Sequence, residues 1–356
     1  MMTRGQLLSS LLLFTVFAGA AAAQRPIPVK VVVVAMFEVG ADTGDSPGEL
    51  QYWVERDHLD HVYSLPAGYH PVRMNDQGEM AVLTGQGTAH AASTIMAVGL
   101  DPRFDFSHAY WMVAGIAGGS PDRVSLGSAV WARWVVDGDL GYEIDAREIP
   151  PDWSTGYLPL RKKLPFETPA DPLDGQAYGL NANLAQWAFD LTKATALEDS
   201  DKLKEIRSHF DGAAAQSPPS VAMGDEISSS TYFHGKLMDA WAEQWVPYFT
   251  GGKGVFATTA MEDTGTLQSI EFLARAGRVD MNRVLVLRAV SNYDRQAVGV
   301  SAAESLERQR IGAYAAYLPA LEAAYRVGHS VVTELLNHWA GYEGTIPQAE
   351  PTAAKP

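Results

Sequence analysis

Continuous apolar runs alternate along the chain with segments of helical periodicity. Val31 to Ala35 is β-branched almost throughout, as expected of a strand that is buried on both faces of a sheet. Segments of the same character predict further strands at 80–83, 109–113, 129–136 and 284–289. Residues 89–99 predict a helix with His90, Thr94 and Val98 on one side. Strands that alternate with helices predict a largely parallel or mixed sheet with helices on both faces.

Residues 150–174 interrupt this alternation, because they are rich in proline and aromatic side chains. We interpret them as a long ordered insertion on the surface, since Trp153, Tyr157 and Phe166 would otherwise be costly to expose. Their basic cluster 161–163 faces either a partner or solvent.

The C-terminal part predicts three helices and a tail. Residues 181–196 have a helical pattern, and two further helices are predicted at 303–325 and 331–339, separated by Gly328. Residues 344–356 are rich in proline, alanine and threonine and predict a disordered tail.

The N-terminus has the pattern of a secretory signal peptide. Arg4 precedes an apolar run over 7–18, and small residues at 21–23 resemble a cleavage site before Gln24. An uncleaved anchor is the alternative, although the run is near the lower length limit for a bilayer span. We therefore expect an exported, periplasmic or extracellular protein, and no later apolar run is long enough for a spanning helix. Residues 24–343 are expected to form one large domain, with two closely joined domains as the alternative.

The amino-acid composition excludes several classes of function and of site. The chain carries 27 basic and 42 acidic side chains, which argues against nucleic-acid binding. It has no cysteine, which excludes disulfides, thiolate metal sites and a cysteine nucleophile. His58 and His61 have no third ligand placed by the sequence, so we predict no metal site.

Three segments could carry chemistry. Thr84-Gly85-Gln86-Gly87-Thr88 follows a predicted strand and precedes a helix, so its backbone N–H groups could face a ligand. It lacks the third glycine of a dinucleotide site and the lysine of a phosphate loop, and a simple tight turn is the alternative.

The second segment, 259–265, places Met261 beside Glu262, as a sugar pocket requires. Met261 would pack under a ribose ring, and Glu262 would accept hydrogen bonds from its hydroxyls. Alternatively, Glu262 and Asp263 only cap the helix that follows. The third segment, 288–294, is a strand that ends in Asn292 and Asp294, the usual place of functional groups in an open α/β sheet, although a turn explains it equally well.

Five stretches together resemble those of the nucleoside phosphorylase and nucleosidase superfamily. They are 31–38, 84–87, 115–119, 259–262 and 288–292. Further runs resemble the purine nucleoside permease family of fungi and bacteria, namely 151–157, 180–181, 251–254, 262–266, 277–280 and 287–293. The resemblance implies a three-layer α/β/α sandwich around a mixed, partly closed central sheet, and usually a homo-oligomer.

The resemblance also implies roles for single residues. Met261 and Glu262 match the pair that holds ribose, Phe233 matches the aromatic residue that stacks on the purine, and 84–87 match the loop beside the anomeric carbon. Asn292 stands where many members carry an aspartate that protonates the leaving purine. An amide can hydrogen-bond the base but cannot act as an acid, and Asp294 could supply the missing carboxyl.

The sequence does not decide whether water or phosphate is the nucleophile. Nucleosidases of the superfamily activate water with a glutamate just after the first strand, and Glu38 lies within one position of that site, although it could instead brace the sheet. Phosphorylases need a basic clamp for phosphate, and no arginine of this sequence aligns with one; Arg56 is only a possibility. We expect no cofactor, with phosphate as an optional co-substrate.

Two functions follow from these features. The first is cleavage of the N-glycosidic bond of purine nucleosides, by a phosphorylase or a hydrolase. The second is a non-catalytic nucleoside-binding protein that serves uptake through a membrane transporter, because a soluble chain cannot itself move solute across a bilayer. The residues favour catalysis slightly.

Overall fold

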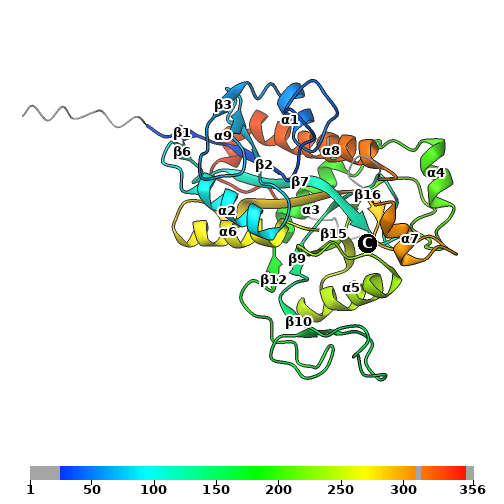
Figure 1. The fold of residues 1–356 in the computed structure, drawn as a ribbon. Coiled ribbons are helices and arrows are strands. Elements are labelled where there is room, and N and C mark those ends of the chain that lie inside the picture. The colour runs from blue at the N-terminus through cyan, green and yellow to red at the C-terminus, as the bar shows by residue number, and fades with distance from the viewer. Residues whose placement is uncertain (1–24, 310–313, 350–356) are drawn as a thin grey trace, which may run out of the picture.

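The computed structural model describes residues 25–309 and 314–349, and its centre is a large mixed β-sheet between two layers of helices (Figure 1). The strands are β1 (Ile27–Pro28), β2 (Val31–Ala35), β3 (His61–Tyr63), β4 (Val72–Met74), β5 (Glu79–Leu83), β6 (Phe104–Asp105), β7 (Tyr110–Gly119), β8 (Ala129–Trp131), β9 (Trp134–Asp137), β10 (Gly141–Glu143), β11 (Tyr157–Pro159), β12 (Ala177–Gly179), β13 (Val221–Met223), β14 (Asp225–Ser228), β15 (Phe256–Ala260) and β16 (Val284–Tyr293). The helices are α1 (Gln51–Arg56), α2 (Thr88–Gly99), α3 (Ala182–Thr192), α4 (Asp201–Arg207), α5 (Lys236–Phe249), α6 (Asp263–Arg275), α7 (Ala302–Glu307), α8 (Tyr317–Asn337) and α9 (Trp339–Tyr342), with a 3₁₀ turn at Met281–Arg283.

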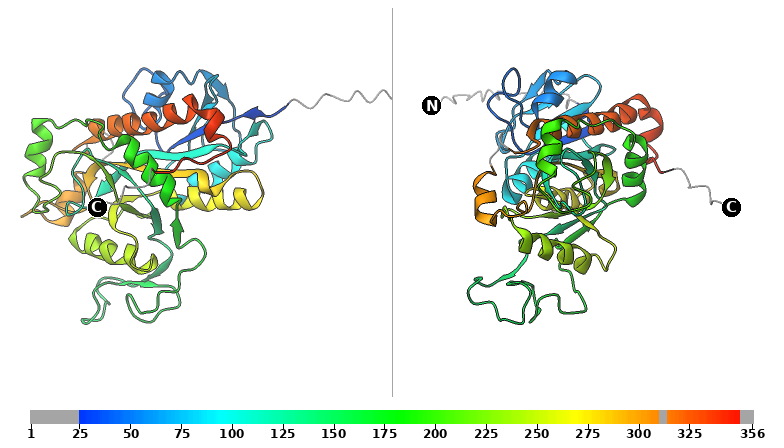
Figure 2. Two further views of the ribbon diagram at one scale, coloured as in Figure 1. Left: turned by 180° about the vertical axis from the view of Figure 1, so that it is seen from behind. Right: turned by 90° about the vertical axis from the view of Figure 1, so that its right-hand side faces the viewer.

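Strand β2 shows how the layers are built. Its alternate residues Val31, Val33 and Ala35 pack in the core beneath α1, α3 and α8, whereas Val32 and Val34 pack in the core beneath α2 and α6. Figure 2 shows the same two layers from behind and from the side. The continuous apolar run therefore reflects burial on both faces, as the sequence predicts.

The sheet closes partly on itself. Strand β7 pairs with β2 and β16 in parallel and with β15 antiparallel. Strand β16 also pairs with β8, and the chain continues from β8 into β9, which leads through β14 back to β15. This circuit, with helices on both sides, is the mixed, partly closed sandwich that the family resemblance implies.

The predicted strand 129–136 is interrupted. It divides into β8 and β9 because the buried carboxylate of Asp225 accepts hydrogen bonds from the backbone N–H groups of Arg133 and Trp134, at 3.0 and 2.9 Å. The last predicted strand is longer than expected, since β16 continues to Tyr293 with a bulge between Val290 and Asn292. The bulge changes the direction in which the residues at the end of the strand point.

The predicted helix break at Gly328 is wrong. Helix α8 runs through Gly328, where a side chain would collide with Trp53 and Met112, so the glycine serves close packing. The interruption lies earlier, between α7 and α8, which separates the predicted helix 303–325 into two. In α2, Thr94 and Val98 are buried, whereas His90 is exposed.

The insertion forms an ordered excursion away from the sheet, visible at the bottom of Figure 1. Residues Trp153, Tyr157 and Phe166 are half-buried in it, and Phe166 packs against Trp245 of α5. Of the predicted tail, Ile346 packs against the core cluster under α8, whereas 350–356 lie outside the described residues. The predicted signal segment, 1–23, also lies outside them.

Candidate functional site

A cavity lies near the ends of β2, β7, β15 and β16, where the sequence places four of its motifs. Its walls are Met36, Phe37, Glu49, Gln86, Ile116, Ala117, Gly118, Thr231, Tyr232, Phe233, Thr259, Ala260, Met261, Glu262, Arg288, Ser291, Asn292, Asp294 and Tyr314. Carboxylates and an arginine gather at one end, and aromatic side chains gather with Asn292 at the other. Of the residues predicted from the sequence, Gln86, Phe233, Met261, Glu262, Asn292 and Asp294 line this cavity.

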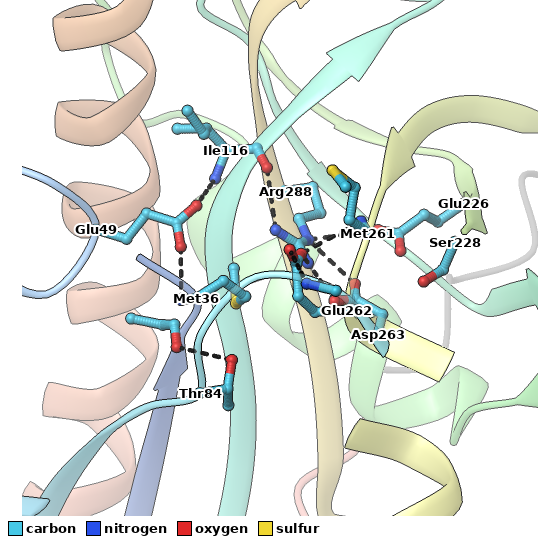
Figure 3. A network of polar contacts seen from close by, with 12 residues as sticks. Met36, Glu49, Thr84, Ile116, Glu226, Ser228, Met261, Glu262, Asp263 and Arg288 are labelled. Carbon is cyan, nitrogen blue, oxygen red and sulfur yellow. Dashed lines mark hydrogen bonds and ion pairs between the residues drawn. The ribbon is translucent and has the colours of Figure 1, made fainter. Parts of the chain in front are cut away.

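Arg288 is the centre of the polar end, and its side chain is only 2% exposed (Figure 3). It donates to both oxygens of Asp263, to the carbonyl of Ile116 at 3.0 Å and to Glu262 at 3.3 Å. The carboxylate of Glu226 lies 3.6 Å from Nε of Arg288. One cation therefore faces three buried carboxyl groups, and burial raises the pKa of Glu226 and of Glu262.

Glu262 does not cap α6, in contrast to the simpler interpretation of the sequence. No side-chain hydrogen bond caps this helix, and Asp263 is directed to Arg288 instead. Glu262 accepts hydrogen bonds from the backbone N–H groups of Gly87 and Met261, each at 3.2 Å, while its carboxylate borders the cavity. Three donors thus fix the orientation of this carboxylate before any ligand arrives.

Glu49 is the second carboxylate of the polar end, and no motif in the sequence marks it. Its oxygens accept hydrogen bonds from the backbone N–H groups of Met36 and Ile116, both at 2.7 Å, as Figure 3 shows. Burial raises the pKa of Glu49 to about 8, with Glu262 adding to the shift and Arg288 opposing it. A buried carboxyl that titrates near neutral pH has the property of a general acid or base.

Glu38 occupies a different place. Its carboxylate accepts hydrogen bonds from the backbone N–H groups of Val39, Gly48, Leu50 and Gln51. It does not line the cavity but a neighbouring surface depression. These hydrogen bonds hold the loop that carries Glu49.

The loop 84–88 joins β5 to α2 as predicted, but most of its polar groups face the protein. The N–H of Gly87 binds Glu262, the N–H of Thr88 donates to Ser230 at 3.0 Å, and the hydroxyl of Thr84 donates to the carbonyl of Gly85 at 2.9 Å. Only Gln86 reaches the cavity wall. Gly85 and Gly87 both have positive φ, which the tight turn requires.

The other end of the cavity suits a flat ring. Phe233 is buried and packs edge-on against Trp241, and Tyr232 and Tyr314 complete the aromatic wall. The amide of Asn292 donates to the hydroxyl of Tyr232 at 3.0 Å and accepts from Ser291 at 2.8 Å. Asp294 lies two residues beyond Asn292 and is almost fully buried.

Arg288 is the only cation among the described lining residues, and it is already bound to carboxylates. Arg56, the candidate phosphate clamp, lies elsewhere: it pairs with Glu322 at 2.8 Å and stacks on Tyr52. Within 25–309 and 314–349, no group of three metal-ligating side chains is positioned to hold a metal ion. None of the described helices is long and apolar enough to cross a membrane.

The fold is that of the nucleoside phosphorylases and nucleosidases. Futalosine hydrolase of Helicobacter pylori superposes with a TM-score of 0.51 at 14% identity, covering 86% of this chain and 98% of the other. The 5′-methylthioadenosine/S-adenosylhomocysteine nucleosidase of Helicobacter pylori gives a TM-score of 0.50 at 14% identity, covering 86% and 99%. These likenesses concern the fold alone.

The chain belongs to the purine nucleoside permease family, whose model matches residues 28–347. A purine nucleoside permease of Candida albicans is 29% identical over 262 residues, which are 72% of this chain and 64% of that protein. A probable purine nucleoside permease of Schizosaccharomyces pombe is 28% identical over 328 residues, which are 87% of this chain and 90% of the relative. The match thus spans less than two thirds of the length of the Candida protein.

Proposed function

We propose that the cavity binds a purine nucleoside and cleaves its N-glycosidic bond with water. The observation that carries this proposal is the pairing of two preoriented carboxylates, Glu49 and Glu262, at one end with an aromatic wall and an amide at the other. Sugar hydroxyls need hydrogen-bond acceptors, whereas a purine needs flat apolar contacts and polar groups at its edge. The two ends of the cavity match these two halves of a nucleoside.

Each residue has a defined task in this proposal. Glu262 accepts hydrogen bonds from the ribose hydroxyls, with Met261 packed beside the ring. Glu49, as a carboxylate, takes a proton from the attacking water. Phe233 stacks on the base, and Asn292 hydrogen-bonds its edge. The negative charge of Glu49 and Glu262 stabilises the cationic sugar that develops as the bond breaks, and fixed charges of this kind contribute most of the rate in many enzymes.

Water is the favoured nucleophile because the described cavity wall has no uncommitted cation for phosphate. Arg288 already binds Asp263 and Glu262, and release of these partners would leave buried carboxylates without a counter-charge. A phosphate dianion placed beside Glu49 and Glu262 would also meet like charge.

A second candidate function is nucleoside binding without turnover, as a step in uptake through a membrane transporter. The amide of Asn292 supports it, because an amide cannot protonate a leaving purine. The relatives named as permeases support it as well. Both candidates include export directed by residues 1–23.

Incubation with inosine, adenosine and guanosine, with and without phosphate, tests the proposal. We expect free base in both conditions and free ribose as the second product, measured by chromatography. Ribose 1-phosphate formed only with phosphate would identify a phosphorylase. Nucleoside binding by calorimetry without release of base would support the uptake function and overturn catalysis.

A further inference from the structure

A second cavity adjoins the aromatic end of the first, and Thr231 and Phe233 line both of them. The hairpin of β10 and β11 forms one wall of the second cavity, α5 forms another, and the segment that follows β14 forms the third. In Figure 1 the hairpin and α5 lie together at the bottom of the molecule. The hairpin contacts α5 at Gly141, where a Cβ would lie 3.5 Å from the ring of Trp245.

Aromatic rings form most of the surface of this second cavity. Phe233, Trp241 and Trp245 are buried, Tyr157 is half-buried, and Tyr142 is 50% exposed. Trp241 is the central ring, because its centroid lies 5.0 Å from that of Tyr157, 5.1 Å from that of Trp245 and 5.5 Å from that of Phe233. A ligand in the second cavity would therefore meet aromatic rings from all three walls.

The charged side chains of the second cavity are all acidic. Asp139 and Glu143 line it, and no lysine, arginine or histidine does so among the described residues. Glu143 accepts a hydrogen bond from the hydroxyl of Tyr157 at 3.2 Å, and Asp139 accepts one from the backbone N–H of Ser230. These bonds orient the two carboxylates. The faces of aromatic rings also carry partial negative charge, so rings and carboxylates both attract a cation.

We propose that the second cavity binds a small organic cation, an alkylated or quaternary ammonium compound. Its alkyl groups would pack on the rings of Trp241 and Tyr157 while its charge is attracted by the ring faces and by the carboxylate of Glu143. A metal ion suits the cavity less well, since Ca²⁺ takes about six to eight oxygen ligands and aromatic walls supply none.

The indole of Trp241 points to a further property of the ligand. Its N–H is buried and has no acceptor among the described residues, whereas the N–H of Trp245 donates to the carbonyl of Asp137 at 2.8 Å. A buried donor without an acceptor is costly, and an oxygen atom on the ligand would supply one. An ammonium compound that also carries a hydroxyl group, such as choline, combines both features.

The second cavity is independent of the proposed cleavage. Neither Asp139 nor Glu143 lines the first cavity, and Glu49 and Glu262 do not line the second. Binding of a cation can therefore be measured without nucleoside, and its result does not depend on whether nucleosides are cleaved.

The first test follows the methyl protons of choline by nuclear magnetic resonance as protein is added at constant ionic strength. Protons held over aromatic faces shift upfield because of the ring currents, whereas a cation held by surface carboxylates alone does not shift in this way. We expect a saturable upfield shift. The neutral analogue of choline, in which carbon replaces the quaternary nitrogen, should bind at least about tenfold more weakly. No saturable shift, or equal binding of both compounds, would overturn the proposal.

The second test removes one of the two carboxylates. Glu143→Gln keeps the size of the side chain but removes its charge, and Kd for choline should rise about two- to fivefold. The matched control is Glu148→Gln, because Glu148 is exposed on the same excursion but does not line the second cavity. Equal changes in the two variants would mean that choline responds only to the general negative charge of the protein.

The third test removes the exposed ring. Tyr142→Leu should reduce the upfield shift at saturation and raise Kd for choline about two- to fivefold. Phe272→Leu, at an exposed position on α6, should change neither value. Because Tyr142 and Glu143 are both exposed, we expect their variants to fold, and urea titration checks this. Wild-type binding of choline in both variants would show that it binds elsewhere and would overturn the proposal.

Discussion

Two arginines on or next to β16 each gather several carboxylates, but they do so in different surroundings. The side chain of Arg288 is 2% exposed, and its partners Glu226, Glu262 and Asp263 are 0%, 7% and 0% exposed. The side chain of Arg295 is 9% exposed, and its partners Asp122, Asp211 and Asp239 are 48%, 65% and 4% exposed. The inner group has little access to water, so its excess negative charge must be reduced by protonation. The outer group keeps most of its charge in solvent.

The two clusters differ in what they can do for the cavity because they lie at different depths in the protein. The inner cluster holds the carboxylate of Glu262 in a fixed orientation at the polar end of the cavity. None of the members of the outer cluster lines the cavity. Because the first cluster is buried, removal of a charge partner from it costs much stability. The second cluster tolerates the same change better, because solvent screens its charges.

The largest expected difference is in the free energy of unfolding, when each of the two arginines is replaced in turn. Arg288→Met should lower the free energy of unfolding by about 3–5 kcal/mol, because it leaves buried carboxyls without a counter-charge. Arg295→Met should lower the free energy of unfolding by less, since Asp122 and Asp211 are exposed and water can solvate their charges. Urea titration measures both, and Arg147→Met, at an arginine whose side chain is 88% exposed, is the control with an expected change within about 0.5 kcal/mol. Equal losses for Arg288 and Arg295 would contradict the contrast between the clusters.

Substitutions of two glutamates of the inner cluster should affect kcat/KM to different extents. Glu262→Gln should lower kcat/KM by about 10²–10³-fold, because the amide loses the charge that faces the ribose. Glu226 does not line the cavity, and both of its oxygens lack a hydrogen-bond donor among the described residues, so Glu226→Gln should change kcat/KM by less than tenfold. Steady-state kinetics with inosine provides both values. Similar losses for the two variants would show that the whole cluster, rather than Glu262, carries the effect.

The pKa of Glu49 predicts a pH dependence with a definite sign. Because the folded pKa of about 8 lies above the ordinary value of 4.5, the folded state binds the extra proton, and stability falls as pH rises from 4.5 to 8. Glu49→Gln has no such proton, so its free energy of unfolding relative to the wild type should rise by at least about 1 kcal/mol from pH 5 to pH 8. Any pH-independent cost of the amide cancels in this comparison.

Activity should depend on Glu49 in the opposite direction. Since the carboxylate form takes the proton from water, kcat/KM of the wild type should rise with pH through about 8. Glu38→Gln is the matched control, because Glu38 braces the same loop from outside the cavity. A profile that rises only near pH 4.5 would mean that burial does not perturb Glu49 as described.

A substitution at the aromatic end of the cavity should have the smallest effect on kinetics. Phe233→Leu keeps an apolar side chain but removes the flat ring, and aromatic contacts of this kind contribute about 0.5–1.5 kcal/mol beyond burial. KM for inosine should therefore rise by up to about tenfold, with little change in kcat. Phe272→Leu, at an exposed position on α6, should leave KM unchanged. A loss confined to kcat would place Phe233 away from the base.

The sequence predicted most of the framework because its signals are local. Apolar runs such as 31–35 and the turn after β5 depend on neighbouring residues, and both are confirmed. The helix boundaries near Gly328 could not be predicted, since Gly328 is required by contacts with Trp53 and Met112, which lie more than two hundred residues away in sequence. The division of 129–136 depends similarly on the distant Asp225.

From local signals, the site was predictable only where it follows a strand. Met261, Glu262, Asn292 and Asp294 stand at strand ends, and all four line the cavity. Glu49 follows an irregular segment with no periodic pattern, so the sequence suggested Glu38, eleven positions earlier, instead. Arg288 did leave a signal that we did not use, because a charged residue within an apolar strand implies a buried partner.

The central claim is that water attacks the nucleoside in the cavity between Glu49 and Glu262. Mass spectrometry of the sugar released from inosine in heavy-oxygen water, without phosphate, tests it most directly. We expect ribose that carries the heavy oxygen at C1′, formed by the wild type and by Glu226→Gln but strongly reduced in Glu262→Gln. Unlabelled inosine recovered intact, although it binds, would contradict the account.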